Sequence, residues 1–198
     1  LAAAEVLLLL SPMIPLLFMG EEWGSTRPFL FFTEHHEELA QAVREGRRAE
    51  FADFSAFLDK KSRERIPDPN ALTTFEASIP DFAARETSPF AACLQRYRTL
   101  LALRHQHIVP RLPGAEALGA NVLGDKAVLA RWQMNDDTQL VIALNLGQQA
   151  ATTPGLGVGQ LLYETTEGAA KAAESGRMPA RTAAAWLRHN PGDEEVSA

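Results

Sequence analysis

The sequence predicts two regions of different class: an α/β or largely helical first part, then a small antiparallel β domain. Helix-forming residues run up to Ser11-Pro12, and a short unbroken apolar stretch follows at residues 14–19. A buried helix followed by a short buried strand is typical of α/β architecture. After residue 114 the pattern changes to short β-rich runs separated by turn residues. We therefore predict parts of residues 1–110 and 111–198, with the boundary near 110–114.

The first twenty residues predict one helix and one strand. The run "LAAAEVLLLL" consists mainly of strong helix formers, and Ser11-Pro12 is a stop signal. The run "IPLLFMG" has the length and composition of a strand that is buried on both faces. The segment "EEWGSTRPFLFFTEHH" then predicts a long loop, whose phenylalanines must pack against another part of the protein.

Three further helices are expected in the first part. Apolar residues at helical spacing predict one helix at about residues 36–52 and a short one at about 72–77. Ser88 and Pro89 supply a cap and a first position for the third helix, in which Arg96 faces away from the apolar side. That apolar side is formed by Phe90, Cys93, Leu94, Tyr97, Leu100, Leu101 and Arg104.

Four runs of the second part carry the β prediction. "KAVLARWQM", "TQLVIALNLG" and "QLLYETT" are short and β-rich, and residues 135–137 predict a hairpin between the first two. The alanines of "RTAAAWLRH" favour a helix, whereas its setting among strands favours a strand.

Composition excludes several classes of function. The chain has 198 residues and a net charge of -6, and no run of basic residues is interleaved with aromatic ones, so we expect no nucleic-acid partner. Its one cysteine, Cys93, fits a reducing, cytoplasmic setting. The apolar start lacks a basic flank and is broken by prolines, so we expect neither a signal peptide nor a membrane span. A start at Leu1 indicates a fragment or a processed product.

Glu21, Glu22 and Trp23 are the candidate residues of a substrate cleft, because they follow directly after the predicted buried strand. The alternative is that the glutamates form salt bridges and Trp23 packs under the loop. Trp23 also belongs to an aromatic cluster with Phe29, Phe31 and Phe32. Packing is the favoured interpretation for most of the phenylalanines, whereas stacking on a sugar stays open for Trp23. No histidine pair has the spacing of metal ligands, so we expect no metal and no cofactor. No residue of the chain is assigned as catalytic.

Several strings together resemble one enzyme family. "PLLFMGEEWGSTRPFLFFTEHHEELAQAVREGRRAEFADF", "IPDPNALTTFEAS" and "YRTLLALR" are similar to the C-terminal part of the maltooligosyltrehalose trehalohydrolases, which are glycoside hydrolases of the α-amylase superfamily. The similarity is strongest over residues 11–104. "MGEEWG" alone occurs in related amylase-type enzymes, and its combination with "PFLFFTEH", "VREGRR" and "PDPN" is more specific.

The resemblance implies an α/β fragment, the last βα part of a (β/α)8 barrel, followed by an antiparallel β-sandwich domain. Residues 14–20 would be the eighth barrel strand and residues 88–106 the closing helix. The three catalytic carboxylates of the family would lie upstream of Leu1, so the isolated chain is expected to be inactive. A maltooligosaccharide-type substrate would be the partner of the full-length enzyme.

Two other functions stay open at this stage, namely a fragment of another superfamily member such as a glycogen branching enzyme, and a structural or sugar-binding module without catalysis. If the chain is a truncated barrel, its barrel strand lacks neighbours and exposes backbone groups and apolar side chains. We therefore expect the chain to self-associate through its N-terminal apolar segment.

Overall fold

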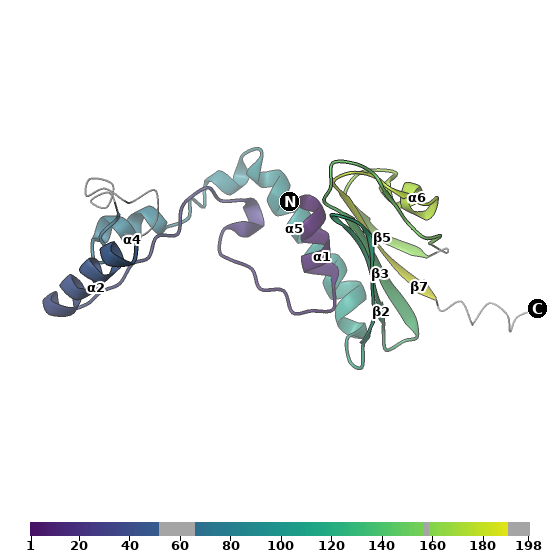
Figure 1. Cartoon of the computed structure of the whole chain (residues 1–198), viewed down its shortest axis with the longest axis horizontal. Helices are drawn as coiled ribbons and strands as arrows, with labels where there is room; N and C mark the ends of the chain where they lie inside the picture. Colours follow the sequence, from purple (N-terminus) through teal and green to yellow (C-terminus); the bar gives the residue numbers. More distant parts are fainter. Residues whose placement is uncertain (52–65, 157–158, 190–198) are drawn as a thin grey trace, which may run out of the picture. The chain divides into compact units, whose positions relative to one another are not determined.

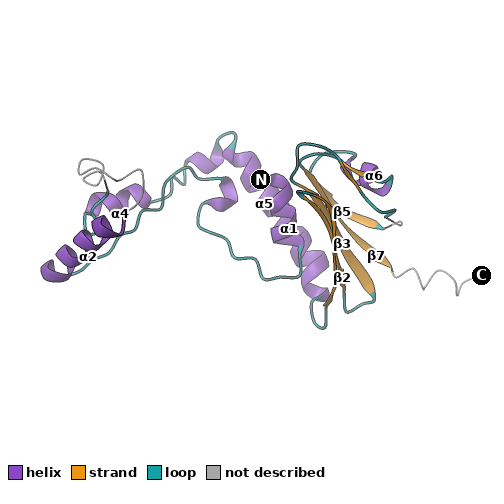
Figure 2. Ribbon diagram, viewed as in Figure 1, coloured by secondary structure: helices purple, strands orange, loops and turns teal. Residues whose placement is uncertain are grey.

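The chain folds into two compact units, and the computed structural model describes residues 1–51, 66–156 and 159–189 of them (Figures 1 and 2). The first, called the sheet unit, combines residues 1–17 with the described residues from Gln95 onward. The second, called the helical unit, comprises the described part of residues 18–94. The division falls inside helix α5 (Phe90–Leu103).

The sheet unit contains the antiparallel β domain that the sequence predicts. Its five-stranded sheet has the order β1-β2-β3-β7-β5, and every neighbouring pair is antiparallel. A two-stranded sheet pairs β4 with β6. The elements are β1 (Glu116–Gly124), β2 (Ala127–Gln133), β3 (Thr138–Asn145), β4 (Ala151–Thr152), β5 (Gln160–Glu164), α6 (Ala169–Glu174), β6 (Arg177–Met178) and β7 (Thr182–His189).

The predicted β-rich runs form β2, β3 and β5, and residues 134–137 connect β2 to β3 as the hairpin prediction requires. The run "RTAAAWLRH" is strand β7, which lies between β3 and β5. Strand β1 was not predicted, because it is an exposed edge strand that contains two glycines and lacks the alternation of a half-buried strand.

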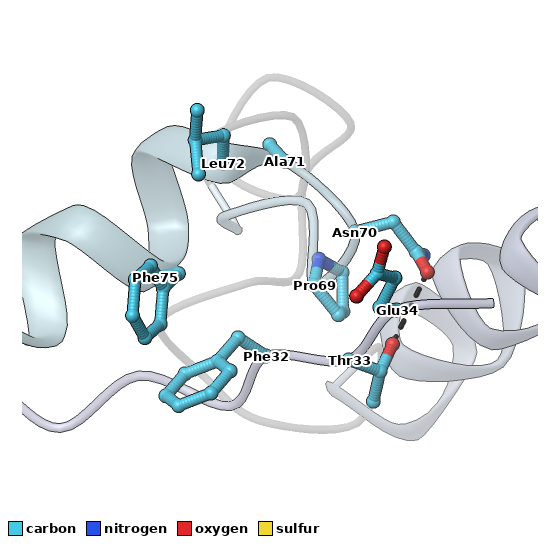
Figure 3. A pocket seen from close by; sticks show the side chains of 8 residues that line it. All are labelled: Phe32, Thr33, Glu34, Pro69, Asn70, Ala71, Leu72 and Phe75. Atoms are coloured by element: carbon cyan, nitrogen blue, oxygen red, sulfur yellow. Dashed lines mark hydrogen bonds between the residues drawn. The ribbon is translucent and has the colours of Figure 1, made fainter.

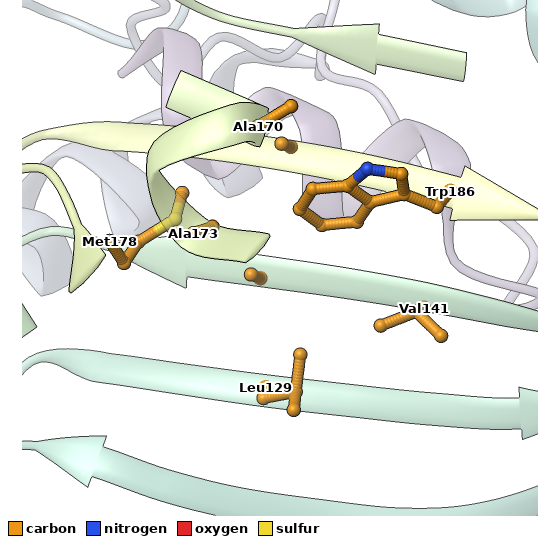
Figure 4. Close-up of a cluster of buried hydrophobic side chains, with 8 residues drawn as sticks. Leu129, Val141, Ala170, Ala173, Met178 and Trp186 are labelled. Atoms are coloured by element: carbon orange, nitrogen blue, oxygen red, sulfur yellow. The ribbon is translucent and has the colours of Figure 1, made fainter. Parts of the chain in front are cut away.

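Both faces of the central strands are covered (Figure 4). On one face, α6 lies over a cluster of buried side chains centred on Trp186. The cluster consists of Leu129, Val141, Ala143, Ala170, Ala173, Met178, Ala184 and Trp186. On the other face, helix α1 (Ala2–Leu10) contacts β3 and β7. Because successive residues of a strand point to opposite faces, this arrangement explains why Leu140, Val141 and Ile142 are all fully buried.

Two arginines of the third predicted helix anchor helix α1. Arg104 lies on the expected apolar side, is only 7% exposed, and donates hydrogen bonds to the carbonyls of Leu9, Ser11 and Met13 at the end of α1. The prediction that Arg96 faces away was wrong, because Arg96 forms a bidentate ion pair with the buried Glu5 of α1. A carboxylate that is removed from water needs such a partner.

The segment expected to be a strand pairs with no strand in the part of the chain that the structure describes. Residues 14–18 lie outside every described helix and strand, and the side chains of Ile14 and Leu16 are 92% and 90% exposed. The expectation of a strand buried on both faces is therefore wrong for the chain as it stands. The physical reason is that a β-strand needs neighbouring backbone to pair with, and none of the described strands pairs with this segment.

The helical unit contains the helices that the apolar spacing predicts. These are α2 (Glu37–Glu50), α4 (Leu72–Ser78) and the first residues of α5, with short 3-10 turns η1 (Glu21–Trp23) and η4 (Ala84–Glu86). Helix α2 confirms the prediction for residues 36–52, although Ala52 lies outside the described residues. After α5 the helical path continues through a π-helical turn (Arg104–Ile108) and a 3-10 turn (Val109–Arg111).

Candidate functional site

The three residues predicted to line a cleft lie on one tight turn of the helical unit. Glu21, Glu22 and Trp23 form η1, which is enclosed by Gly20 and Gly24. Both glycines have positive φ, at 87° and 72°. A side chain at Gly20 would also place its Cβ atom 2.7 Å from that of Ser25. This turn therefore requires glycine, and the "MGEEWG" string is the sequence of a compact turn.

The three side chains have different environments. The Glu21 carboxylate accepts a hydrogen bond from the backbone N–H of Phe18 at 3.0 Å, so it stabilises the entry into the turn. Trp23 is only 3% exposed, and its ring lies 5.6 Å from that of Phe82. Its indole N–H is buried without a hydrogen-bond acceptor among the described residues. Glu22 is partly exposed.

The phenylalanines of the long loop form a chain of edge-to-face contacts rather than a flat stacking surface. Phe18 packs on Phe29 with ring centroids 5.2 Å apart, Phe29 on Phe32 at 5.7 Å, and Phe32 on Phe75 of α4 at 5.2 Å. Such contacts are favourable beyond the burial of apolar area. The structure thus gives Phe29 and Phe32 the packing role that the sequence favoured. Phe31 instead lies under the guanidinium of Arg47, at 4.8 Å.

A cavity of about 430 Å³ opens at the end of this row of rings. Figure 3 shows the eight side chains that line it, from the loop and from the start of α4. They are Phe32, Thr33, Glu34, Pro69, Asn70, Ala71, Leu72 and Phe75. Its volume lies in the range of about 300–1,000 Å³ that is typical of small-molecule sites. We call this site the Phe32–Phe75 cavity.

Hydrogen bonds fix the polar side of the Phe32–Phe75 cavity. The backbone N–H of Thr33 donates to the carbonyl of Pro69 at 2.8 Å, and its hydroxyl lies 3.1 Å from Oδ1 of Asn70. The Asn70 amide donates to the carbonyl of Ala40 at 3.2 Å. The Glu34 carboxylate, in contrast, has no hydrogen-bond or ion-pair partner within the part of the chain that the structure describes. One acidic group is therefore free at an otherwise fixed rim.

Asp68 supports the same rim from behind. Its carboxylate accepts hydrogen bonds from the backbone N–H of Asn70 at 3.0 Å and from Arg44 at 2.7 Å. Burial acts to raise the pKa of Asp68, but the bonds from Asn70 and Arg44, together with the charge of Arg44, hold it below its ordinary value. Asp68 thus stays ionised at neutral pH and positions Asn70.

The sequence did not indicate this cavity. Phe75 lies more than forty positions from Phe32, and only the fold of α4 against the loop brings their rings together. Glu34 follows directly after the aromatic run, but nothing in the sequence shows that Asn70 lies beside it.

Another cavity, of about 520 Å³, lies in the sheet unit at the turn that follows β1 and the connection after β3. Its lining includes Asp125, Lys126 and Gln149 but no aromatic ring, and Asn145 at its floor is hydrogen-bonded to the carbonyls of Gln149 and Met178. Among the described residues, no group of three His, Cys, Asp or Glu side chains could hold a metal ion. Within the same residues, none of the helices has the length and apolar character needed to cross a membrane.

Comparison with known proteins identifies relatives of this chain. Residues 115–186 match the family described as a domain of unknown function, DUF3459. The malto-oligosyltrehalose trehalohydrolase of Deinococcus radiodurans is 44% identical over 140 residues, which are 71% of this chain and 22% of that protein. The Mycobacterium tuberculosis protein of the same name is 36% identical over 166 residues, which are 83% of this chain and 27% of that protein.

Solved structures agree with this relationship. A Salmonella typhimurium protein described as an α-amylase is 36% identical, with a TM-score of 0.77 over 95% of this chain and 30% of that one. An isomaltulose synthase from Erwinia rhapontici shares the fold, with a TM-score of 0.52 at 13% identity over 96% of this chain and 38% of that one. The chain spans about a quarter of the length of the curated relatives. By sequence, this chain is therefore similar to a C-terminal portion of the malto-oligosyltrehalose trehalohydrolases, and its structure is similar to part of an enzyme of the α-amylase superfamily.

Proposed function

We propose that this chain is part of a glycoside hydrolase that releases trehalose from maltooligosyltrehalose by hydrolysing the adjacent α-1,4-glucosidic bond. The observation that carries this proposal is the identity of 36–44% to named trehalohydrolases over 140–166 residues. Within such an enzyme, residues 1–110 would be the end of the (β/α)8 barrel and residues 111–198 the C-terminal β-sandwich domain. The single cysteine cannot form a disulfide within the chain, which is consistent with a cytoplasmic enzyme.

The exposed segment of residues 14–19 supports the barrel assignment. It carries Ile14, Leu16, Phe18 and Met19 with at least half of each side chain exposed. An exposed, unpaired apolar segment of this kind promotes aggregation. Its composition is typical of a strand that is buried on both faces of a sheet. In the isolated chain, the same segment would make copies self-associate.

The isolated chain would not catalyse the reaction. Glycosidases with retaining chemistry need two carboxyl groups about 5–5.5 Å apart, on opposite sides of the glycosidic bond. Glu21 and Glu22 are neighbours on one turn, and Glu21 is bonded to the backbone of Phe18. The catalytic acids of the family would come from the part of the barrel that precedes this chain.

Of the three cleft candidates, we infer that Glu22 is the one placed to reach a substrate. Glu22 is partly exposed, whereas the ring of Trp23 is buried. The Glu21 carboxylate already accepts a hydrogen bond from the backbone of Phe18. Active sites of (β/α)8 barrels lie at the C-terminal ends of the strands, which is where η1 would lie if residues 14–19 form the eighth strand. Glu21 and Trp23 would then hold the turn that presents Glu22.

Two experiments test this function. The gene upstream of Leu1 should encode seven further βα units that carry the three catalytic acids, and an in-frame stop codon close to Leu1 would contradict the proposal. The purified 198-residue chain should release no trehalose from maltooligosyltrehalose. Measurable turnover by this chain would show that its own carboxylates suffice for catalysis, and it would contradict the proposal that the catalytic acids lie outside the chain.

A further inference from the structure

We propose that the Phe32–Phe75 cavity binds a glucosyl unit of a malto-oligosaccharide, at a site separate from the Glu21–Trp23 turn. The choice of an α-linked glucan rests on the proposed function, whereas the site itself rests on three observations. These are an apolar wall with accessible aromatic rings, an acidic group without a partner among the described residues, and a rim that hydrogen bonds fix in place.

The apolar wall suits the face of a pyranose ring. Phe75 is 43% exposed and Leu72 is 68% exposed, although both line a concave surface with Phe32. Sugar rings present C–H groups on their faces, and aromatic rings bind such apolar faces while leaving the hydroxyl groups at the edge. The Phe32–Phe75 contact, 5.2 Å between centroids, fixes the two rings at an interplanar angle of 77°.

The polar rim suits hydroxyl groups, which both donate and accept hydrogen bonds. Figure 3 shows the Glu34 carboxylate turned into the cavity beside Pro69 and Asn70. An ionised carboxylate only accepts hydrogen bonds, whereas the amide of Asn70 has two N–H donors and uses one for the carbonyl of Ala40. The rim therefore offers an acceptor and a donor next to each other. A cationic ligand could use only the acceptor.

The site is organised before a ligand arrives. Thr33 and Asn70 join the loop to the start of α4, and Asp68 with Arg44 holds Asn70 from behind. A fixed rim reduces the entropy that binding would otherwise lose by ordering side chains. The 430 Å³ volume leaves room for one sugar unit, with the chain entering and leaving through the open side.

The test is a titration of the purified, ¹⁵N-labelled chain with maltotriose, in which binding is measured from the changes in amide chemical shift. We expect saturable shifts at residues 32–34 and 69–75. Glu34→Leu and Phe75→Ala should each weaken binding by about tenfold or more, as expected when a hydrogen bond to a charged group or an aromatic wall is lost. Matched controls are Glu38→Leu and Phe82→Ala, which remove an exposed glutamate and an exposed phenylalanine outside the cavity.

Each other outcome has a defined meaning. Absence of maltotriose binding, shifts confined to other residues, or equal affinity in the cavity variants and the controls would overturn the proposal. If free arginine shifts the cavity residues and maltotriose does not, the site is a cation site and the sugar assignment is wrong. Should Phe75→Ala lose its dispersed spectrum, Leu72→Asp at the exposed rim replaces it, with the same expected loss.

The outcome is separable from that of the proposed function. Trehalose release by a longer protein, without any effect of Glu34→Leu on maltotriose binding to the chain, would overturn the site and leave the function standing. Binding through the cavity, without trehalose release by the longer protein, would leave the site standing and overturn the function.

Discussion

Replacing Arg104 by methionine should destabilise the sheet unit, because Arg104 satisfies the carbonyl groups at the end of helix α1. The guanidinium donates to the carbonyls of Leu9, Ser11 and Met13 at 3.0, 2.5 and 2.7 Å. Leu9 and Ser11 are buried, so their carbonyls would lose their donor without gaining water, whereas Met13 is exposed. Each buried unsatisfied group costs about 1–3 kcal/mol.

Two such carbonyl groups together would reduce the free energy of unfolding by at most about 2–6 kcal/mol. Removing the arginine also relieves the desolvation of a buried charge, the effect that lowers the pKa of Arg104. We therefore expect Arg104→Met to reduce the free energy of unfolding by about 2–4 kcal/mol. Arg104→Lys keeps the charge but cannot span three carbonyls, so it should lose about half as much.

The measurement is urea denaturation followed through the indole N–H signal of Trp186, which reports on the sheet unit because that group donates to Glu174 at 3.0 Å. The matched control is Arg98→Met, an exposed position of helix α5, which directly precedes Arg104; it should change the free energy of unfolding by less than about 0.5 kcal/mol. Equal losses for the two variants would refute the capping role of Arg104.

The remaining predictions concern the helical unit and the unpaired segment. Trp23→Phe should change the free energy of unfolding, measured by thermal denaturation, by less than about 1 kcal/mol, since it removes a buried donor that has no acceptor among the described residues. Trp23→Ala should lose about 3–5 kcal/mol, and a large loss in Trp23→Phe would show that the indole N–H is bonded. The depressed pKa of Asp68 stabilises the folded helical unit above pH 3.8, and this stability is lost as the pH falls through the folded-state pKa. Asp68→Asn should therefore flatten the pH dependence of the stability of α2 and α4 in that range, and an unchanged pH dependence would contradict this. Sedimentation should show concentration-dependent association that the double variant Ile14→Glu/Leu16→Glu abolishes, and a wild-type monomer at high concentration would exclude self-association through this segment.

Local sequence patterns predicted the regular elements well, because those elements follow from residue spacing. The leucine-rich start, the spacing around α2 and α5, and the β-rich runs of β2, β3 and β5 all became the expected elements. The same patterns failed at residues 14–19. The composition of that segment is typical of a buried strand, but a strand forms only with neighbours.

Contacts between residues far apart in the sequence could not be predicted, because local patterns carry no information about them. Helical periodicity placed Arg104 on the buried side but could not show that it reaches the carbonyls at the end of α1, more than ninety residues earlier. Arg96 was misassigned because its partner, Glu5, is equally distant. Of the candidate residues, the sequence singled out Glu21, Glu22 and Trp23, whose place in a substrate cleft stays a prediction. It did not indicate the cavity, because Glu34, Asn70 and Phe75 meet only through the fold.

Trehalose release is the measurement that tests the proposed function most directly. The longer protein encoded by a reading frame that continues upstream of Leu1 should be incubated with maltooligosyltrehalose, alongside the isolated chain. We expect free trehalose from the longer protein and none from the chain. Transfer of glucan branches without trehalose release by the longer protein, or trehalose release by the chain itself, would contradict the proposal.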